Sequence, residues 1–223
     1  MAARLPTPGA ILFDLDCTLT DRRASIECFA SRFISRFGSG MIGDSRSLLN
    51  AMLLADENGY APRSNFIQSL RQAELWKNIP RSGAIEVLWR DEFPACTRPA
   101  PLLLSTLKQL LERRIKLGLV SNGSAGMQRR KIEALRISPY LSTIAISAEV
   151  GLRKPDVRIF RLALEAMGMT PSQSWFVGDH PVYDMAGAHA AGLTAIQICA
   201  MDHPARDGCL QIREISELLD LME

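Results

Sequence analysis

Cysteine, histidine and lysine are scarce in this chain of 223 residues, and their scarcity limits the chemistry that it can perform. The five cysteines are scattered and form no CxxC pair, so neither a disulfide framework nor a zinc site is indicated, and reduced thiols in a cytoplasmic protein are expected. The three histidines, His180, His189 and His203, do not have the spacing of metal ligands. Only five lysines accompany 21 arginines, so a lysine in a special position stands out.

The chain also lacks a block of like charge and a long apolar run. With a net charge of +2 and no basic cluster, we expect no nucleic-acid partner. No stretch approaches a membrane span and the first residues lack the apolar core of a signal peptide, so we expect no membrane partner. A hydrophobic content of 47% is sufficient for a core, and the length allows a main domain with a smaller one inserted.

Two patterns of apolar residues divide the chain. Residues 21–94 have helical periodicity and predict four helices, at about 26–37, 45–58, 64–75 and 82–89, with Asp44 or Ser45 capping the second. Elsewhere predicted strands (11–13, 115–120, 142–147, 174–177, 193–198) alternate with predicted helices (102–114, 124–135, 156–167, 182–191, 213–221). The sequence therefore predicts an α/β fold: a three-layer α/β/α Rossmann-like parallel sheet from residues 1–20 and 95–223, with an inserted all-α helical bundle, residues 21–94.

Polar segments stand at the ends of three predicted strands and before one predicted helix. They are Asp14 and Asp16; Ser121-Asn122-Gly123; Lys154-Pro155-Asp156, with Asp156 near the helix N-cap; and Gly178-Asp179 with Asp184. Each has an ordinary interpretation by itself, as a turn or a helix start. Together they indicate one shared site, because the carboxyl ends of parallel strands meet at one edge of a sheet. Buried carboxylates at that edge are costly unless they are paired or bound to metal.

These four segments, in this order, resemble the motifs of the haloacid dehalogenase superfamily, in its phosphatase branch with a helical cap inserted after the first motif. Asp14–Thr20 resembles the first motif (DxDxT), and the Ser-Asn-Gly, Lys-Pro and Gly-Asp-x4-Asp segments resemble the second, third and fourth. One departure is Cys17, where the family commonly has glycine or asparagine. Family members hydrolyse phosphoglycolate, sugar phosphates, acylneuraminate phosphates or nucleoside monophosphates.

The resemblance implies a Mg²⁺-dependent phosphomonoester hydrolase that acts on a small phosphorylated metabolite through an aspartyl-phosphate intermediate. Asp14 would be the nucleophile, Asp16 the general acid and base, and Lys154 the group that neutralises charge between nucleophile and phosphate. The implied Mg²⁺ ligands are the Asp14 side chain, the Asp16 backbone carbonyl and Asp179, with Asp184 orienting a metal-bound water or Lys154.

The implied phosphate-binding residues are Thr18, which would also fix the loop, Ser121, Asn122 through its backbone amide, and Lys154. The inserted bundle would close over the site, with residues 21–25 and 38–43 expected to contact substrate and His180 expected at the edge of the site. The chain would act as a monomer or homodimer.

Other functions on the same fold stay open at this point. A 2-haloacid dehalogenase also uses an aspartate nucleophile but needs neither metal nor a second acid, so Asp16 argues against it. A phosphomutase cap of this kind generally supplies a histidine, and residues 21–93 contain none. A phosphonatase needs a cap lysine, for which Lys77 is the one available. A non-catalytic sensor of phosphorylated metabolites would not require all four motifs.

Overall fold

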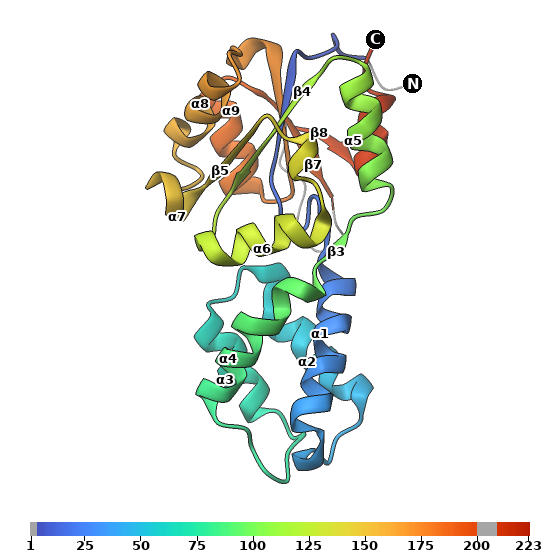
Figure 1. Ribbon diagram of the computed structural model, residues 1–223, viewed down its shortest axis with the longest axis vertical. Coiled ribbons are helices and arrows are strands. Elements are labelled where there is room, and N and C mark those ends of the chain that lie inside the picture. Colours follow the sequence, from blue (N-terminus) through green and yellow to red (C-terminus); the bar gives the residue numbers. More distant parts are fainter. Residues whose placement is uncertain (1–3, 200–208) are drawn as a thin grey trace. The chain divides into compact units, whose positions relative to one another are not determined.

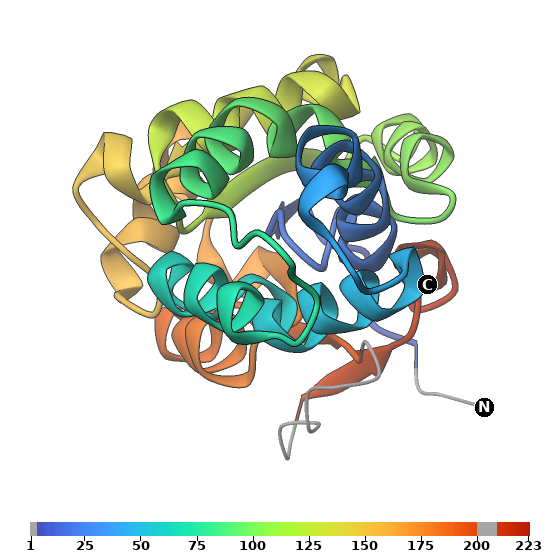
Figure 2. The ribbon, with the colours of Figure 1, turned by 90° about the horizontal axis from the view of Figure 1, so that it is seen from below.

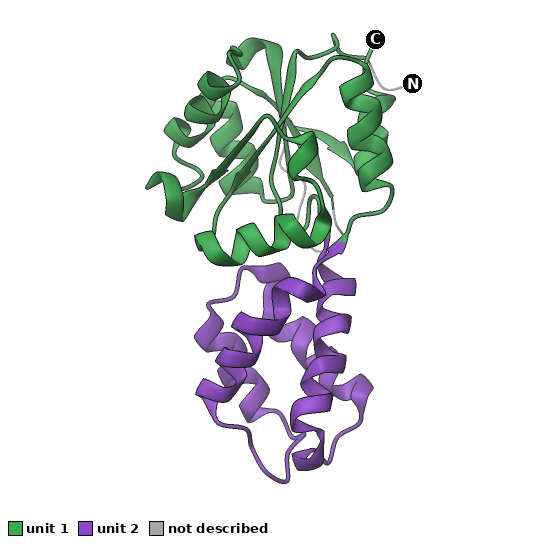
Figure 3. Cartoon of the chain, viewed as in Figure 1, with its two compact units in different colours: residues 1–20, 99–223 green, residues 21–98 purple. Residues whose placement is uncertain are grey.

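The computed structural model describes residues 4–199 and 209–223, so His203 lies outside the described residues. The chain divides into two compact units, residues 1–20 with 99–223 and residues 21–98 (Figure 3). Two short strands, β2 Thr20–Asp21 and β3 Arg98–Pro99, pair where the chain passes from the first unit to the second and back. Among the described residues, no helix combines the length and the apolar character that crossing a membrane requires.

A six-stranded sheet forms the centre of the first unit, with strand order β5-β4-β1-β6-β7-β8 and parallel pairing throughout (Figure 1). Its strands are β1 Ala10–Phe13, β4 Lys116–Ser121, β5 Thr143–Ile146, β6 Ser174–Gly178, β7 Thr194–Ile198 and β8 Leu210–Ile212. Phe13 lies opposite both Leu119 and Val177 in the register of the sheet. The carboxyl ends of β1, β4 and β6 therefore meet at one edge.

Helices cover both faces of this sheet. They are α5 Leu103–Glu112, α6 Ala125–Leu135, α7 Ser147–Val150, α8 Val157–Ala166 and α9 Gly187–Ala191, with the π-helix η6 Pro181–Ala186 and the 3-10 helices η4 Ser138–Tyr140, η5 Pro171–Gln173 and η7 Ile215–Leu219. Side chains alternate along a strand, so Ile11 and Phe13 pack with α5, α6 and η7, whereas Ala10 and Leu12 pack with α8 and α9. The predicted three-layer α/β/α fold is confirmed.

The second unit is a helical bundle (Figure 2). Its helices are α1 Arg22–Phe37, α2 Ser45–Asp56, α3 Arg63–Gln72 and α4 Ser82–Glu92, with the 3-10 helices η1 Gly38–Gly40, η2 Glu57–Gly59 and η3 Phe93–Cys96. The four helices form a ring of contacts, because α1 and α3 each contact both α2 and α4. Aromatic rings fill the core, including the edge-to-face pair of Phe29 and Trp89, and Arg22 stacks on Phe93 while it forms a buried ion pair with Asp56.

The predicted secondary structure is wrong mainly near the C-terminus. Where a helix was expected at 213–221, the chain has a single 3-10 helix, η7, preceded by the sixth strand, β8. A 3-10 helix places residues three apart on one face, which is how Ile215 and Leu218 both reach the core. The third predicted helix stops at Gln72 rather than near 75, and the helix expected at 182–191 begins as the π-helix η6. The N-caps at Asp44 and Asp156 are confirmed.

Candidate active site

The site begins with Asp14 and Asp16, which follow β1 at the carboxyl edge of the sheet. The backbone N–H of Asp14 donates to the carbonyl of Val177 on β6 over 2.9 Å, which fixes the start of the loop. The chain then turns at Cys17, whose φ of 59° is a left-handed conformation that glycine and asparagine adopt most easily. The Cys17 N–H donates to Thr20 Oγ1 over 3.0 Å. The departure from the family pattern at Cys17 therefore concerns backbone conformation and not the chemistry of the loop.

Lys154 joins Asp14 to another strand end. Its buried ammonium forms an ion pair with Asp14 and lies 2.6 Å from Asp184 Oδ1. The side chain of Asn122 holds the backbone of Lys154: Oδ1 accepts from the Lys154 N–H over 2.9 Å, and Nδ2 donates to the Lys154 carbonyl over 3.1 Å. Asn122 thus positions the segment that carries Lys154, and the assignment of its backbone amide to a phosphate stays a prediction.

Three buried carboxylates meet at this edge of the sheet. Asp14, Asp179 and Asp184 each offer an oxygen, and these oxygens lie within 4.8 Å of one another. Asp184 is held in place because its Oδ2 accepts the backbone N–H of His180 over 3.0 Å. Gly178 leaves the necessary space, since a Cβ at that position would lie 2.6 Å from the Asp184 carboxyl carbon. The glycine that precedes Asp179 is therefore required by the close approach of Asp184.

Burial and charge set the ionisation of this group. Burial is the largest influence on Asp14, and with the negative charges of Asp184 and Asp16 it outweighs the Lys154 ammonium and raises the pKa of Asp14 to about 7. Burial alone lowers the pKa of Lys154, but the attraction of Asp14 and Asp184 outweighs burial, so its pKa is raised and it stays charged. Asp14, Asp179 and Asp184 together offer three buried carboxyl oxygens, and oxygen ligands of this kind are those that Mg²⁺ prefers.

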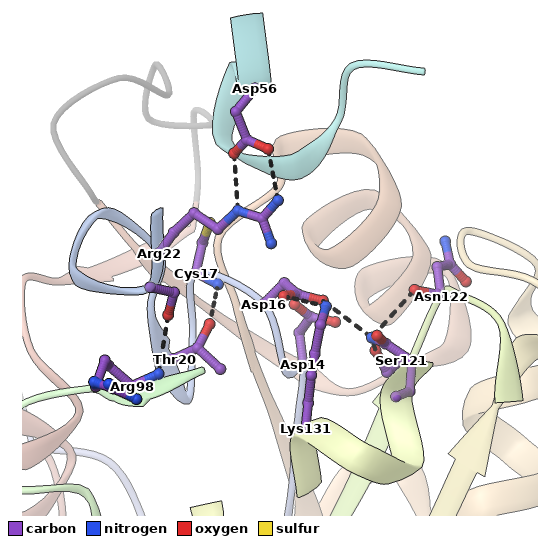
Figure 4. A network of polar contacts seen from close by, with 12 residues as sticks. Asp14, Asp16, Cys17, Thr20, Arg22, Asp56, Arg98, Ser121, Asn122 and Lys131 are labelled. Atoms are coloured by element: carbon purple, nitrogen blue, oxygen red, sulfur yellow. Dashed lines mark hydrogen bonds and ion pairs between the residues drawn. The ribbon is translucent and has the colours of Figure 1, made fainter. Parts of the chain in front are cut away.

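A second ion pair involves residues that the sequence analysis did not single out. Lys131 on α6 places its ammonium 2.7 and 2.8 Å from the two oxygens of Asp16. Gln128, one turn earlier on α6, donates from Nε2 to Asp16 Oδ2 over 3.0 Å and to Ser121 Oγ over 2.7 Å. Figure 4 shows the side chain of Lys131 beside Asp16, with Ser121 nearby. We call Gln128 and Lys131 the α6 pair; both bind Asp16, and Gln128 also connects Asp16 to Ser121.

Thr18 and His180 have different surroundings from each other. Thr18 Oγ1 is buried and forms no hydrogen bond with another described residue, so it can bind a ligand oxygen. His180 was expected at the edge of the site, but its Nδ1 accepts the N–H groups of Val182 and Tyr183 over 3.1 and 3.0 Å, and its ring stacks on Tyr183. The His180 side chain is thus occupied as the N-cap of η6.

Comparison with known proteins agrees with this geometry. A family model described as haloacid dehalogenase-like hydrolase matches residues 11–198, a range that contains every predicted site residue. The chain belongs to this family. The predictions of family, of fold class and of a hydrolase of the phosphatase kind are thereby confirmed. The two segments predicted to contact substrate, 21–25 and 38–43, belong to the second unit of this hydrolase, and that contact stays a prediction.

The relatives of this HAD-like hydrolase include phosphatases. It is 36% identical over 193 residues to the glyceraldehyde 3-phosphate phosphatase of Methanopyrus kandleri, covering 85% of this chain and 83% of that enzyme. It is 39% identical over 92 residues to the phosphoserine phosphatase of Thermus thermophilus, a match that spans 41% of this chain and only 37% of that enzyme. Among solved structures, the HAD-hydrolase YfnB of Bacillus subtilis, solved bound to magnesium, has the same fold, with a TM-score of 0.74, 20% identity and 99% of both chains covered.

The α6 pair is the part of this HAD-like hydrolase that sequence reasoning missed. A signal was present, because the scarcity of lysine that drew attention to Lys154 applies equally to Lys131. Lys131 also lies three residues after Gln128 on a predicted helix, so the two side chains share one face of it. What the sequence could not show is that this face points at Asp16, 112 to 115 residues earlier in the chain.

Proposed function

We propose that this protein is a Mg²⁺-dependent phosphomonoester hydrolase that acts on a small phosphorylated metabolite, with phosphorylated sugars as the first class to test. The observation that carries the proposal is the buried ion pair of Asp14 with Lys154 beside Asp179 and Asp184, with the second carboxylate of Asp16 close by. Its phosphatase relatives are named for glyceraldehyde 3-phosphate and for phosphoserine, which are both small phosphomonoesters.

Asp14 would supply the attacking oxygen. This oxygen forms a bond to phosphorus while the bond from phosphorus to the leaving oxygen breaks, which produces an aspartyl phosphate. Asp16 in its acid form would donate its proton to the leaving oxygen. As a carboxylate it would then take a proton from the water that attacks phosphorus, which releases inorganic phosphate and restores Asp14. General acid–base assistance of this kind is worth about 10²- to 10⁴-fold in rate.

Other side chains of the site would bind the phosphate oxygens. Ser121 and the backbone amide of Asn122 stand at the carboxyl end of β4, shortly before the N-terminus of α6, a position that favours anions. The buried hydroxyl of Thr18, which has no partner among the described residues, supports its predicted part in this group. Lys154 lies against Asp14 and would neutralise charge between that carboxylate and the phosphate.

The carboxylates of Asp14 and Asp179 and the backbone carbonyl of Asp16 would hold Mg²⁺, and Asp184 would orient Lys154 or a water. When bound, the ion supplies the positive charge that allows a phosphate dianion to approach two carboxylates. The geometry supports this assignment, because Asp14, Asp179 and Asp184 each offer a buried carboxyl oxygen within 4.8 Å of the others.

The nearest competing function is that of a 2-haloacid dehalogenase, which shares the fold and the aspartate nucleophile. Asp16 separates the two functions, since a dehalogenase has no need of a second acid. In this structure Asp16 is bound by two buried side chains, Gln128 and Lys131. An incidental turn residue would not require partners that are themselves costly to bury, and this favours the phosphatase.

The test is a single panel on the purified full chain. Phosphorylated sugars, phosphoserine, nucleoside monophosphates and phosphonates are assayed for phosphate release, and 2-haloacids for halide release, with Mg²⁺ and with EDTA. We expect phosphate release from at least one phosphomonoester that EDTA abolishes and Mg²⁺ restores. Full activity in EDTA would overturn the metal assignment, and halide release without phosphate release would establish the dehalogenase instead.

Two substitutions complete the panel. Asp14→Asn is expected to abolish turnover in a folded protein, because the amide is a poor nucleophile. Asp156→Asn is the matched control: Asp156 is the partly exposed N-cap of α8, where asparagine is an equally good cap, so the rate of this variant is expected to equal that of the wild type. A wild-type rate in Asp14→Asn would place the nucleophile elsewhere.

A further inference from the structure

The α6 pair holds the carboxylate of Asp16 at three points. Both oxygens of Asp16 contact the Lys131 ammonium, and Oδ2 also accepts from Gln128. A carboxylate bound through both oxygens and from a second direction is fixed in rotation as well as in position. We infer that Gln128 and Lys131 are positioning residues that hold the Asp16 carboxyl group where it can transfer a proton to and from the reacting oxygens, an inference that rests on the proposed function.

The fold alone does not explain these two side chains. Lys131 is 5% exposed and Gln128 is 2% exposed, whereas the Asp16 side chain that they bind is 27% exposed. Burying an ammonium and an amide is costly, and replacing a buried ion pair by apolar residues is often neutral or stabilising. Apolar residues suit this helix, because Ile132 and Leu135 of α6 are buried in the core. Burying this polar pair therefore adds little to the stability of the fold. Its main effect is to hold the carboxyl group of Asp16 in place.

Gln128 also connects the acid to the predicted phosphate site. Its Nε2 donates to Ser121 Oγ over 2.7 Å and to Asp16 Oδ2 over 3.0 Å, so one amide group sets both positions. A proton donor must lie within hydrogen-bond reach of the leaving oxygen, and a misplacement of about 1 Å can cost about 10²-fold in rate. Ser121 and Asp16 belong to different strand ends, and Gln128 is the residue seen to bridge them.

The backbone near Ser121 is shaped to receive Gln128. Gly123 has a φ of 155°, and a Cβ at this position would lie 2.9 Å from both Cγ and Cδ of Gln128. Such contacts are too short for any larger residue unless Gln128 moves. The glycine of the Ser-Asn-Gly segment therefore makes room for Gln128, which is an observation independent of the hydrogen bonds of the α6 pair.

The experiment compares two substrates that differ in their need for an acid. Glyceraldehyde 3-phosphate has an alkoxide leaving group that must be protonated, whereas 2,4-dinitrophenyl phosphate has a leaving group that departs without a proton. The quantity compared is kcat/KM, which reports the steps up to departure of the leaving group. The variants are Lys131→Met, which removes the ammonium and retains the bulk of the side chain, and Gln128→Met. Lys108→Met, at an exposed position of α5, is the control.

We expect Lys131→Met to lower kcat/KM for glyceraldehyde 3-phosphate by about 10- to 100-fold, a part of what acid catalysis supplies. For 2,4-dinitrophenyl phosphate the loss is expected to stay within about threefold, because no proton is transferred before this leaving group departs. Gln128→Met also removes the hydrogen bond to Ser121, so it is expected to lower kcat/KM for both substrates, and more for glyceraldehyde 3-phosphate than for 2,4-dinitrophenyl phosphate. Lys131→Arg, which keeps the charge, is expected to recover most of the activity lost in Lys131→Met. In an Asp16→Asn background, Lys131→Met is expected to have no further effect.

Equal losses on the two substrates in Lys131→Met, an unchanged or faster rate in that variant, or a full additional loss in the Asp16→Asn background would each overturn the positioning role. If Lys131→Met does not fold, two results decide instead: the loss in Gln128→Met must be larger for glyceraldehyde 3-phosphate than for 2,4-dinitrophenyl phosphate, and Lys131→Arg must retain most of the wild-type activity. Failure of the proposed function looks different, because the wild type itself would then release no phosphate from either substrate.

Discussion

Asparagine in place of Asp14 is expected to make the metal-free protein more stable, although it is also expected to abolish catalysis. Asp14 lies buried among Asp179 and Asp184, with Lys154 as the ammonium that faces it. Above neutral pH its charge must be kept in this environment, at a cost to folding. Asparagine has nearly the same shape and no charge, and Lys154 retains its contact with Asp184.

The size of the effect follows from the pKa of Asp14. Burial and the neighbouring carboxylates raise this pKa from 3.8 to about 7. A carboxyl group whose pKa is higher in the folded than in the unfolded state binds its proton more tightly when the protein is folded. At low pH this bound proton adds to the free energy of unfolding, and the contribution is lost as the pH rises through about 7. A shift of about three pH units corresponds to about 4 kcal/mol, a figure that already includes the opposing attraction of Lys154.

The assay is urea denaturation in EDTA at several pH values between about 4 and 8, the range over which linkage predicts the change. The free energy of unfolding of Asp14→Asn minus that of the wild type is expected to increase with pH and to level off above about pH 7. The control is Asp156→Asn. Hydrogen bonds from Arg158 lower the pKa of Asp156 to about 2, so its carboxylate contributes stability above about pH 4 that is lost only in strong acid, and this variant is expected to gain nothing at any pH tested.

The reasoning would be refuted if Asp14→Asn were less stable than the wild type in EDTA at about pH 8, or if the difference did not change with pH. Adding Mg²⁺ provides a second test. At 100 times its dissociation constant, a ligand that binds only the folded state stabilises it by about 2.7 kcal/mol. The wild type is expected to gain this stability and Asp14→Asn, which lacks a ligand, to gain much less.

Two further substitutions, at Asp16 and at Gly178, each test the role given to one residue of the site. Asp16→Ala is expected to lower kcat/KM for glyceraldehyde 3-phosphate by about 10²-fold or more, measured by phosphate release, and a loss of tenfold or less would remove Asp16 as the acid. Gly178→Ala is expected to lower the free energy of unfolding by about 1–3 kcal/mol and to reduce activity, because its Cβ would displace Asp184. Gly126→Ala is the control, since a Cβ at Gly126 has nothing within 4 Å, and thermal unfolding of the two variants should differ accordingly.

Local sequence patterns were a reliable guide to the elements of this protein and to most of its candidate site. The apolar run before Asp14 predicted a buried strand, and all four residues of β1 are fully buried. The capping aspartates Asp44 and Asp156 predicted two helix starts that the structure contains. These predictions succeeded because strand burial and N-capping depend on a few consecutive residues.

Errors occurred where distant contacts decide local structure. A helix was predicted at 213–221 and no strand before it, yet Leu210–Ile212 forms a strand because the edge of β7 is available for pairing. The same limit applies to the segment after β6, where Pro181 begins a π-helix and Asp184 accepts the backbone N–H of His180, beside the close approach to Gly178. Local periodicity cannot report such contacts, because they depend on which groups the fold leaves nearby.

The sequence by itself determined that Asp14, Asp16, Lys154 and Asp179 stand at strand ends or helix starts, because that placement follows from where apolar runs stop. The tertiary structure decided which of them pair. It joined Lys154 to Asp14, used the side chain of Asn122 to hold Lys154, and brought α6 against Asp16 through residues with no recognised motif. Pairing of charges depends on distances across the sheet edge, and these exist only once strands far apart in sequence lie in register.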